Sequence, residues 1–346
     1  MKAYIPVIKK IIGHEFTNVS NIVNFNKNGT LSIVTPFYLV EIKTDVKFKY
    51  SAGVDFNTLE KYLTYFDLSD TKFTKEYVTF EKGGFKGIIP FHKGKLECSS
   101  EIKEMLNNIE LRKIDYTYRR CMENADAILT RTGSGAVKMV TVDGKENTHS
   151  IMFYDITSSL IYFNVGEESP FIDMGNITLS KDLIFPEFVV PYIGMDDNGF
   201  LVLQVKNDVF NGVKGLGYRN DVSGDSKAFF EKMRSQYNDL EKGISFVIKI
   251  TDLEKACLCF NLIPDELATF DGNKLMITTA SSVVEIPMQV ESSNIEGQVT
   301  LFSPNFRRYA AYMYNNGASC INIFGYERYI LAISDMEGMV FVEGTY

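Results

Sequence analysis

The chain has 346 residues, more than one compact core usually holds, so we expect two or three domains. Hydrophobic residues make up 45% of it and charged residues 23%, a composition typical of a globular protein rather than a disordered or fibrous one. The formal net charge of −8 argues against a protein that nucleic acid wraps as a whole, although it allows a local basic surface.

The cysteines and the apolar runs indicate a reducing compartment and no membrane segment. The apolar stretch within MKAYIPVIKKIIGHEF is too short, and too interrupted by lysine, for a secretory signal. No run approaches the roughly 18 apolar residues that a membrane span needs. The cysteines are scattered without metal-ligand spacing, as reduced thiols are; they are Cys98, Cys121, Cys257, Cys259 and Cys320. We therefore expect a cytoplasmic protein.

Five segments, taken in chain order, have the i, i+3, i+4, i+7 spacing of a helix with one apolar face. Each follows a residue suited to a helix start, such as a side chain that caps the first turn or a proline in that turn. In order, these residues are Pro6, Asp55 or Asn57, Asp115, Thr251 and Ser303. A sixth candidate near Lys181 is interrupted by Pro186. Two more helices, polar and amphipathic, are expected near 100–113 and 225–242.

Between the helices the sequence predicts strands, with alternating or continuous apolar runs that are separated by glycine-containing turns. The pattern repeats as six strand–helix–strand units that start near residues 5, 55, 115, 179, 252 and 303. Taken in pairs, the units predict three similar domains, 1–107, 108–240 and 241–346. The two polar helices fall where these domains are joined.

The five helices share a frame of one apolar residue, two mostly charged residues and two further residues of the buried stripe. It reads IKKII, LEKYL, YRRCM, LEKAC and FRRYA. The second charged position lies about 200° from the first apolar residue around the helix, so it points away from the core. It is basic every time. The basic residues of the frame, called here the basic row, are Lys9, Lys10, Lys61, Arg119, Arg120, Lys255, Arg307 and Arg308.

A basic residue on an exposed helix face most often does no more than face solvent. If exposed positions were filled without regard to sign, however, acidic residues would hold this one about half the time. Arg307 and Arg308 also lie near the positive end of their helix, where the helix dipole disfavours a cation. Local helix stability therefore does not explain the pattern, and we infer a shared anionic partner.

Catalytic motifs are absent from the sequence. The three histidines, His14, His92 and His149, are far apart and belong to no metal or triad motif. RTGSGAVK, from Arg131 to Lys138, lacks the spacing of a phosphate-binding loop and is interpreted as a turn. We expect neither an enzyme nor a cofactor or metal ion. An α+β enzyme whose site carries no recognisable motif is the remaining alternative of that class.

The paired repeats with one basic helix face resemble the bacterial type (beta subunit) of DNA polymerase sliding clamp. The segment from Ser303 to the end, SPNFRRYAAYMYNNG onward, is similar to the last half-domain of that family, and IKITDLEKACLCFNLIPDELATF to the half before it. Where the family carries TDG-x-R-L, IMFYDITSSLIYF supplies Asp155 and Leu160 but not the Gly and Arg. The resemblance implies an α+β DNA-clamp fold of three similar domains, with helices on an inner face and antiparallel sheets outside. It is that of a divergent, plausibly phage-encoded member.

The resemblance also implies a function. Two chains would close head to tail into a ring around double-stranded DNA, which the basic row would attract without reading its sequence. The clamp would hold peptides of the DNA polymerase and of the clamp loader in an apolar pocket. By position the pocket residues are Thr157, Leu160, Met339, Phe341 and Val342, although the family's terminal Met-Pro pair is absent. The alternative is a non-enzymatic, β-rich structural or adaptor protein, such as a virion component, that uses the basic helices for protein contacts.

Overall fold

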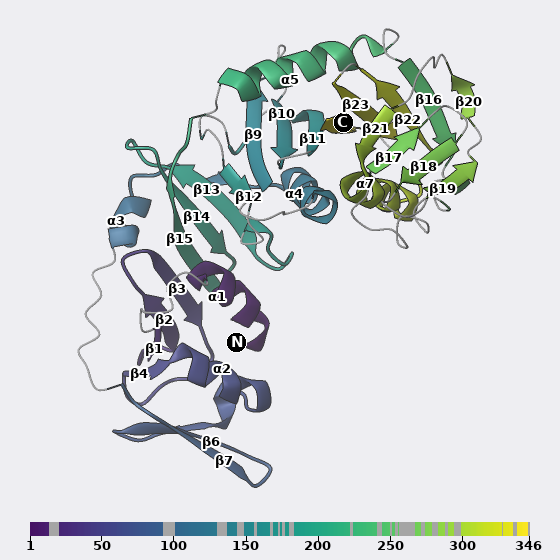
Figure 1. The fold of residues 1–346 in the computed structure, drawn as a ribbon. Coiled ribbons are helices and arrows are strands. Elements are labelled where there is room, and N and C mark those ends of the chain that lie inside the picture. Colours follow the sequence, from purple (N-terminus) through teal and green to yellow (C-terminus); the bar gives the residue numbers. More distant parts are fainter. Residues whose placement is uncertain are drawn as a thin grey trace. The chain divides into compact units, whose positions relative to one another are not determined.

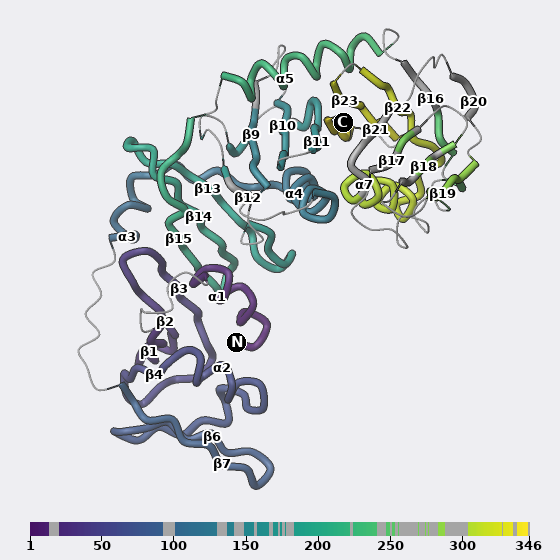
Figure 2. The backbone as a smooth tube through the Cα atoms, in the orientation of Figure 1, coloured from purple at the N-terminus to yellow at the C-terminus, as the bar shows by residue number. Residues whose placement is uncertain are grey.

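The structure is a computed structural model that describes most of the chain (Figures 1 and 2). The described residues are 1–13, 21–92, 101–129, 137–143, 149–155, 158–166, 169–171, 174, 177–179, 183–221, 224–240, 244–249, 251–252, 255, 267–270, 274–278, 283–287, 290–293, 299–326, 328–334 and 338–344. The chain forms two compact units, Met1–Ile114 with Lys181–Arg219, and Asp115–Ser180 with Asn220–Tyr346. Each unit is described by itself.

The first unit is built on an eight-stranded antiparallel sheet. Its strands, in spatial order, are β4 (Ala52–Asp55), β1 (Ile22–Phe25), β2 (Thr30–Val34), β3 (Tyr38–Lys43), β15 (Phe210–Tyr218), β14 (Phe200–Lys206), β13 (Val190–Met195) and β8 (Arg112–Lys113). A second sheet consists of β5 (Thr71–Phe73), β6 (Tyr77–Lys82) and β7 (Phe85–Pro90). The α-helices of this unit are α1 (Ile5–Ile12), α2 (Phe56–Tyr65) and α3 (Glu101–Leu106). Short 3₁₀ turns cover Lys2–Tyr4 and Leu68–Asp70.

The second unit repeats this plan. Its large sheet runs β12 (Ile177–Leu179), β9 (Val137–Asp143), β10 (His149–Tyr154), β11 (Ser158–Gly166), β24 (Met339–Gly344), β23 (Tyr329–Ser334), β22 (Cys320–Gly325), β16 (Ile244–Lys249) and β20 (Val290–Ser293). A four-stranded sheet runs β19 (Val283–Pro287), β18 (Lys274–Thr278), β17 (Leu267–Phe270) and β21 (Val299–Phe302). The helices include α4 (Tyr116–Ile128), α5 (Gly224–Tyr237) and α7 (Ser303–Asn315), and residues 251, 252 and 255 are also helical.

Side-chain caps and apolar stripes fix the helices where the sequence predicts them. The Asp55 carboxylate accepts a hydrogen bond from the Thr58 amide at 2.8 Å, and Asp115 accepts one from the Tyr118 amide at 3.1 Å. The stripe of α7, from Phe306 to Met313, is fully buried. The structure thus confirms α1, α2, α4 and α7. Of the predicted fourth helix it describes only Thr251, Asp252 and Lys255, all helical, and the region of the sixth candidate is partly outside the described residues.

Both large sheets are covered by helices on both faces. In the first unit Leu39 and Val213 pack under α3, whereas their strand neighbours face α1. Gly212 shows how closely α1 approaches, because a Cβ at this position would lie only 3.1 Å from Ile11 of α1. In Figure 1 α1 and α3 accordingly lie on different sides of β3 and β15.

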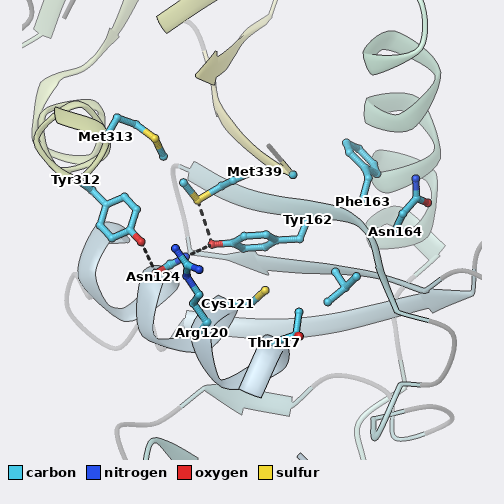
Figure 3. Close-up of a pocket in the computed structure, with 12 residues that line it drawn as sticks. Thr117, Arg120, Cys121, Asn124, Tyr162, Phe163, Asn164, Tyr312, Met313 and Met339 are labelled. Atoms are coloured by element: carbon cyan, nitrogen blue, oxygen red, sulfur yellow. Dashed lines mark hydrogen bonds between the residues drawn. The ribbon is translucent and has the colours of Figure 1, made fainter. Parts of the chain in front are cut away.

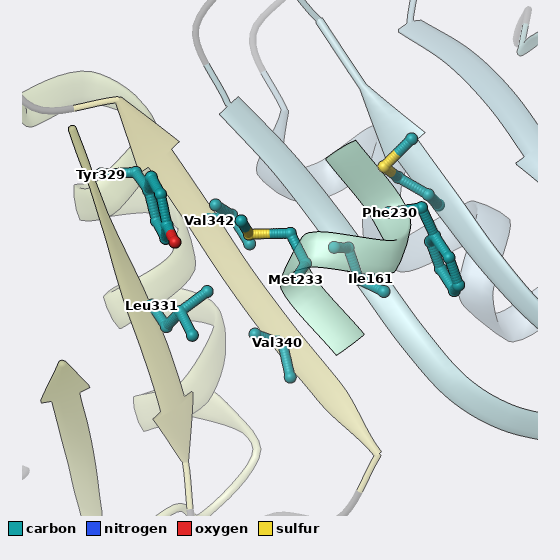
Figure 4. Close-up of a cluster of buried hydrophobic side chains, with 8 residues drawn as sticks. Ile161, Phe230, Met233, Tyr329, Leu331, Val340 and Val342 are labelled. Atoms are coloured by element: carbon teal, nitrogen blue, oxygen red, sulfur yellow. The ribbon is translucent and has the colours of Figure 1, made fainter. Parts of the chain in front are cut away.

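In the second unit α5 covers the face of the sheet that α4 and α7 leave open. Phe230 and Met233 of α5 pack on Ile161, Val340 and Val342 (Figure 4). The ammonium of Lys232 lies 4.8 Å from the centre of the Tyr329 ring, and the Tyr329 hydroxyl donates a hydrogen bond to Gln236. The two polar helices predicted from the sequence, α3 and α5, therefore each cover one face of a large sheet.

The mixed helices and antiparallel sheets confirm the predicted α+β class. Each large sheet takes strands from two of the three predicted domains: β1–β4 lie within 1–107, whereas β8 and β13–β15 lie within 108–240. A sheet that crosses a domain boundary joins neighbouring repeats more tightly than a linker does. The boundaries at 107 and 240 stay a prediction.

Candidate nucleic-acid interface

The basic row occupies α1 and α2 in the first unit. Lys61 is exposed. The exposed Lys9 ammonium lies 2.6 Å from the carboxylate of the half-buried Glu60, and this pair links the two helices. Lys10 differs from the prediction that its position points away from the core. It is half-buried, donates a hydrogen bond to the carbonyl of Ile184 and lies 5.6 Å from the centre of the Phe185 ring.

In the second unit the row follows α4 and α7, which lie side by side (Figure 1). Arg120 and Arg308 are exposed, as the helical spacing predicts, and Arg119 and Arg307 are half-buried. The Lys255 ammonium lies 3.1 Å from the Asp252 carboxylate, one turn earlier. Within each unit, the basic positions thus lie on helices. Of the five positions predicted to point away from the core, Lys10 alone is half-buried rather than exposed.

A chain of hydrogen bonds joins α4, α7 and the sheet beneath them (Figure 3). The Tyr312 hydroxyl donates to Asn124 at 2.6 Å, and the Asn124 amide donates to the Tyr162 hydroxyl at 3.0 Å. That hydroxyl donates in turn to the Met339 sulfur at 3.0 Å. Asn124 therefore satisfies two tyrosines at once and fixes the spacing between the two helices.

The hydrogen-bonded contact between α4 and α7 is called here the seam. Burial and Arg120 shift the pKa values of its side chains. Burial raises the pKa of Tyr162 well above its ordinary value and raises the pKa of the Cys121 thiol to about 12, so both stay neutral at physiological pH. Burial also raises the pKa of Tyr312, against the opposing charge and hydrogen bond of Arg120. The Arg120 guanidinium accordingly turns toward the Tyr312 hydroxyl (Figure 3).

Beside the seam is a cavity of about 350 Å³ between α4, α7 and the ends of β11 and β24. Thr117 and Arg120 lie at its exposed rim, and Cys121, Met313 and Met339 form its buried floor. The sequence prediction named two of its lining residues, Arg120 and Met339, for other roles but missed the cavity itself. Its walls come from four elements distant in the chain, and the only local signal was the polar Asn124 at the edge of the stripe of α4.

The residues predicted for a peptide pocket occupy three different environments where the structure describes them. Leu160 and Phe341 are cross-strand partners whose side chains are fully buried, and the Phe341 ring stacks on Tyr309 of α7 with centres 4.9 Å apart. Val342 lies on the opposite face, beneath α5. Met339 lines the α4–α7 cavity, and Thr157 lies outside the described residues.

The structure also bears on two other classes of function. Among the residues it describes, no group of three or more histidine, cysteine, aspartate or glutamate side chains is arranged to hold a metal ion. No helix in that same part of the chain is both long enough and apolar enough to cross a membrane.

Comparison with known proteins identifies the fold. No protein-family model matches the chain, and no curated protein matches its sequence. Solved structures do match: the Helicobacter pylori beta clamp bound to a DNA ligase peptide has a TM-score of 0.64 at 10% identity and covers 100% of this chain and 97% of its own. The Pseudomonas aeruginosa DNA polymerase sliding clamp, solved with a ligand, has a TM-score of 0.65 at 10% identity, with 99% and 95% covered. The beta subunit from DNA polymerase of Streptococcus pyogenes gives 0.62 at 10%, with 99% and 96%. The chain therefore has the fold of bacterial beta sliding clamps over its whole length.

Proposed function

We propose that this protein is a DNA sliding clamp, a non-enzymatic processivity factor that encircles duplex DNA as a head-to-tail ring of two chains. The observation that carries the proposal is the match of the whole chain to bacterial beta clamps at nearly their full length. In the cytoplasm, or in that of the host if a phage encodes it, the ring would tether the replicative polymerase to its template.

The strand order within the chain supports ring closure. In both large sheets the two halves meet through the third strand that follows the start of a repeat, β3 with β15 and β11 with β24. These junctions join the first repeat to the fourth and the third to the sixth. In both cases the partners are three repeats apart. By the same rule the fifth repeat of one chain would join the second repeat of another chain, which is the eighth when the count continues past six. The strands left to pair are β19 and β7, each at the edge of its described sheet.

The surface of these two edges fits that role. Phe85 and Ile88 of β7 are 76% and 48% exposed, and Val283 of β19 is 57% exposed, whereas Leu39 and Phe341 in the paired junctions are fully buried. An apolar edge strand of this kind is an aggregation hazard unless another strand covers it. Pairing between chains removes the hazard at both edges together.

The outer faces of the same two sheets also differ from those of the large sheets. On the small sheets these faces carry ion pairs, between Lys72 and Glu81 and between Lys274 and Glu285. On the large sheets the corresponding faces are apolar and are covered by α3 and α5. In a ring, the junction between chains is the one that no connecting segment spans. A charged outer face requires no covering helix there.

Duplex DNA would be held by the basic row through long-range attraction to phosphates. Such contacts are independent of sequence and sensitive to salt, as sliding requires. The net charge of −8 leaves the remaining surface acidic, which disfavours binding of DNA outside the ring.

Peptides of the polymerase and the clamp loader are the proposed protein partners. The DNA ligase peptide bound by the H. pylori clamp supports a peptide site on this fold. We place it along the β11–β24 junction, with Thr157, Leu160, Met339, Phe341 and Val342 as the predicted residues. Leu160, Met339 and Phe341 are at most 6% exposed and would support a peptide on one face of the sheet while their neighbours contact it, whereas Val342 faces α5 on the other.

Charge reversal on two helices tests the DNA contact. The double variant Lys61→Glu, Arg308→Glu is expected to weaken DNA association and to reduce the slope of log affinity against log salt by about 1 per lost phosphate contact. Affinity is measured between low and physiological salt by fluorescence anisotropy with labelled duplex DNA. The denaturation midpoint is measured alongside to show that folding is intact.

The matched control is Lys47→Glu, Lys227→Glu, which changes the charge equally at exposed lysines outside the basic row. It is expected to keep most of the salt slope. An equal loss of slope in both variants would mean that only net charge matters, and an unchanged slope in the first would mean that the helices face something other than DNA.

A further inference from the structure

The α4–α7 cavity has the chemistry of a site for a small anion with a flat ring attached. Arg120 lies at its rim with its guanidinium beside the Tyr312 hydroxyl (Figure 3), and the Thr117 hydroxyl is a further hydrogen-bonding group of the lining. No lining residue in the described part of the chain is acidic. An arginine with neighbouring hydroxyls is suited to the oxygens of a phosphate or carboxylate.

The inner walls are soft and uncharged. Met313 and Met339 bring two thioethers, and the Cys121 thiol is protonated because burial raises its pKa to about 12. The sulfur of a thioether is a favourable partner for a planar ring, often at the ring edge. At about 350 Å³ the cavity is near the lower end of the range of small-ligand sites, roughly 300–1,000 Å³, so it has room for one ring and its anionic group but not for a longer segment.

We propose that this cavity binds one unpaired nucleotide of single-stranded DNA, with its phosphate on Arg120 and its base against Met313 and Met339. The inference rests on the proposed function, since it is the passage of DNA along α4 and α7 that brings nucleotides to the rim. A nucleotide is favoured over a peptide carboxylate because Arg120 belongs to the basic row, whose other members have no role in holding a single carboxylate.

Only an unpaired nucleotide has access to the site. In duplex DNA each base is stacked and paired, and its removal from the stack is unfavourable, whereas an unpaired base is free to contact protein groups. The site would therefore distinguish single-stranded from paired DNA within a protein whose other DNA contacts are indifferent to it. It gives the ring a preferred position next to a gap or a primer end.

Methionine methyl groups report directly on the cavity. The chain has 13 methionines, of which Met313 and Met339 line the cavity, whereas Met152 of β10 and Met233 of α5 pack together on the opposite face of the sheet. In protein labelled with ¹³C at the methionine methyls, thymidine 5′-monophosphate and a thymidine tetranucleotide are expected to shift the Met313 and Met339 signals, assigned with Met→Leu variants. The Met152 and Met233 signals are expected to stay in place.

Two variants and two other probes make the test decisive. Arg120→Gln is expected to weaken the titration at least tenfold, and Thr117→Trp, which places a bulky ring at the rim, to abolish it, while Lys227→Gln leaves it unchanged. The unshifted signals show in each case that the fold is retained. The proposal is overturned if neither nucleotide probe moves the two signals, if a blunt duplex hairpin moves them equally, or if N-acetylphenylalanine moves them and the nucleotides do not. None of these outcomes bears on retention of the ring on fully paired circular DNA, so the proposed function is tested separately.

Discussion

At the scale of single residues, sequence spacing was enough wherever the surroundings of a side chain come from its own helix. Arg120 and Arg308 are exposed as the helical frame predicts, and the stripe from Phe306 to Met313 is buried. Lys10 is the exception because the carbonyl of Ile184, 174 positions further along the chain, accepts a hydrogen bond from its ammonium. A helical wheel gives no information on contacts between residues so far apart in the sequence. The Asn124 bridge between two tyrosines was missed for the same reason.

The buried tyrosine of α7 gives a pH prediction at this scale. Tyr309 is fully buried, and burial raises its pKa above the ordinary value of 10.0. Below pH 10 the phenol is protonated in both states, so its contribution to stability is fully present. As pH rises past 10 the unfolded chain releases the proton while the folded protein retains it, and stability falls by up to about 1.4 kcal/mol per pH unit for this group.

The variant Tyr309→Phe isolates that contribution. It removes the ionisable hydroxyl, which donates to the Ala332 carbonyl at 3.0 Å, and keeps the ring that stacks on Phe341. Between pH 9 and pH 11 the free energy of unfolding, from urea titrations, is expected to fall less in the variant than in the unmodified protein. Equal falls would show that Tyr309 ionises as readily in the folded protein as in the unfolded chain.

At the scale of elements, the six-unit repeat predicted the helices but not the way the sheets are shared. Strand order depends on which edges meet, and a one-dimensional pattern does not record that. The same gap explains α3 and α5. Their polar sequences indicated helices at domain junctions, whereas the apolar sheet faces that they cover, around Val213 and around Ile161, are assembled from distant strands. Each connecting helix covers a junction between the third strands of two repeats. The third strands of the other two repeats, β7 and β19, lie at the edges of their described sheets.

Pairing of β7 with β19 predicts how the ring dissociates. A carboxylate placed in the junction would be buried between chains without a partner, which is costly. We therefore expect Ile88→Asp, and separately Val283→Asp, to shift the protein from two chains toward one in sedimentation equilibrium. Val209→Asp places the same charge on a 42% exposed valine in the β14–β15 turn and is expected to leave the mass unchanged. A mass of one chain for the unmodified protein at micromolar concentration, or the same mass for all three variants, contradicts this pairing.

At the scale of the whole molecule, a fold shared at 10% identity shows what specifies it. The chain differs from the solved clamps at nine positions in ten and still has their fold, so a periodic pattern of buried positions and the order of the repeats are enough to set the core. Outward positions are under no such packing constraint. The recurrence of Lys or Arg at the outward position of five helices of this acidic chain is for this reason the sequence feature on which the proposed DNA contact most depends.

The proposed ring stays on DNA because it is closed around the duplex, not because it binds the duplex tightly. The most direct measurement loads the protein onto nicked circular DNA, removes unbound protein by gel filtration at salt high enough to screen the basic row, and then cuts the circle once. We expect the protein to stay with the intact circle and to leave within minutes of linearisation, when the ends allow it to slide off. Equal retention on circular and linear DNA, or no retention on either after the same loading with the cognate loader present, would contradict the account.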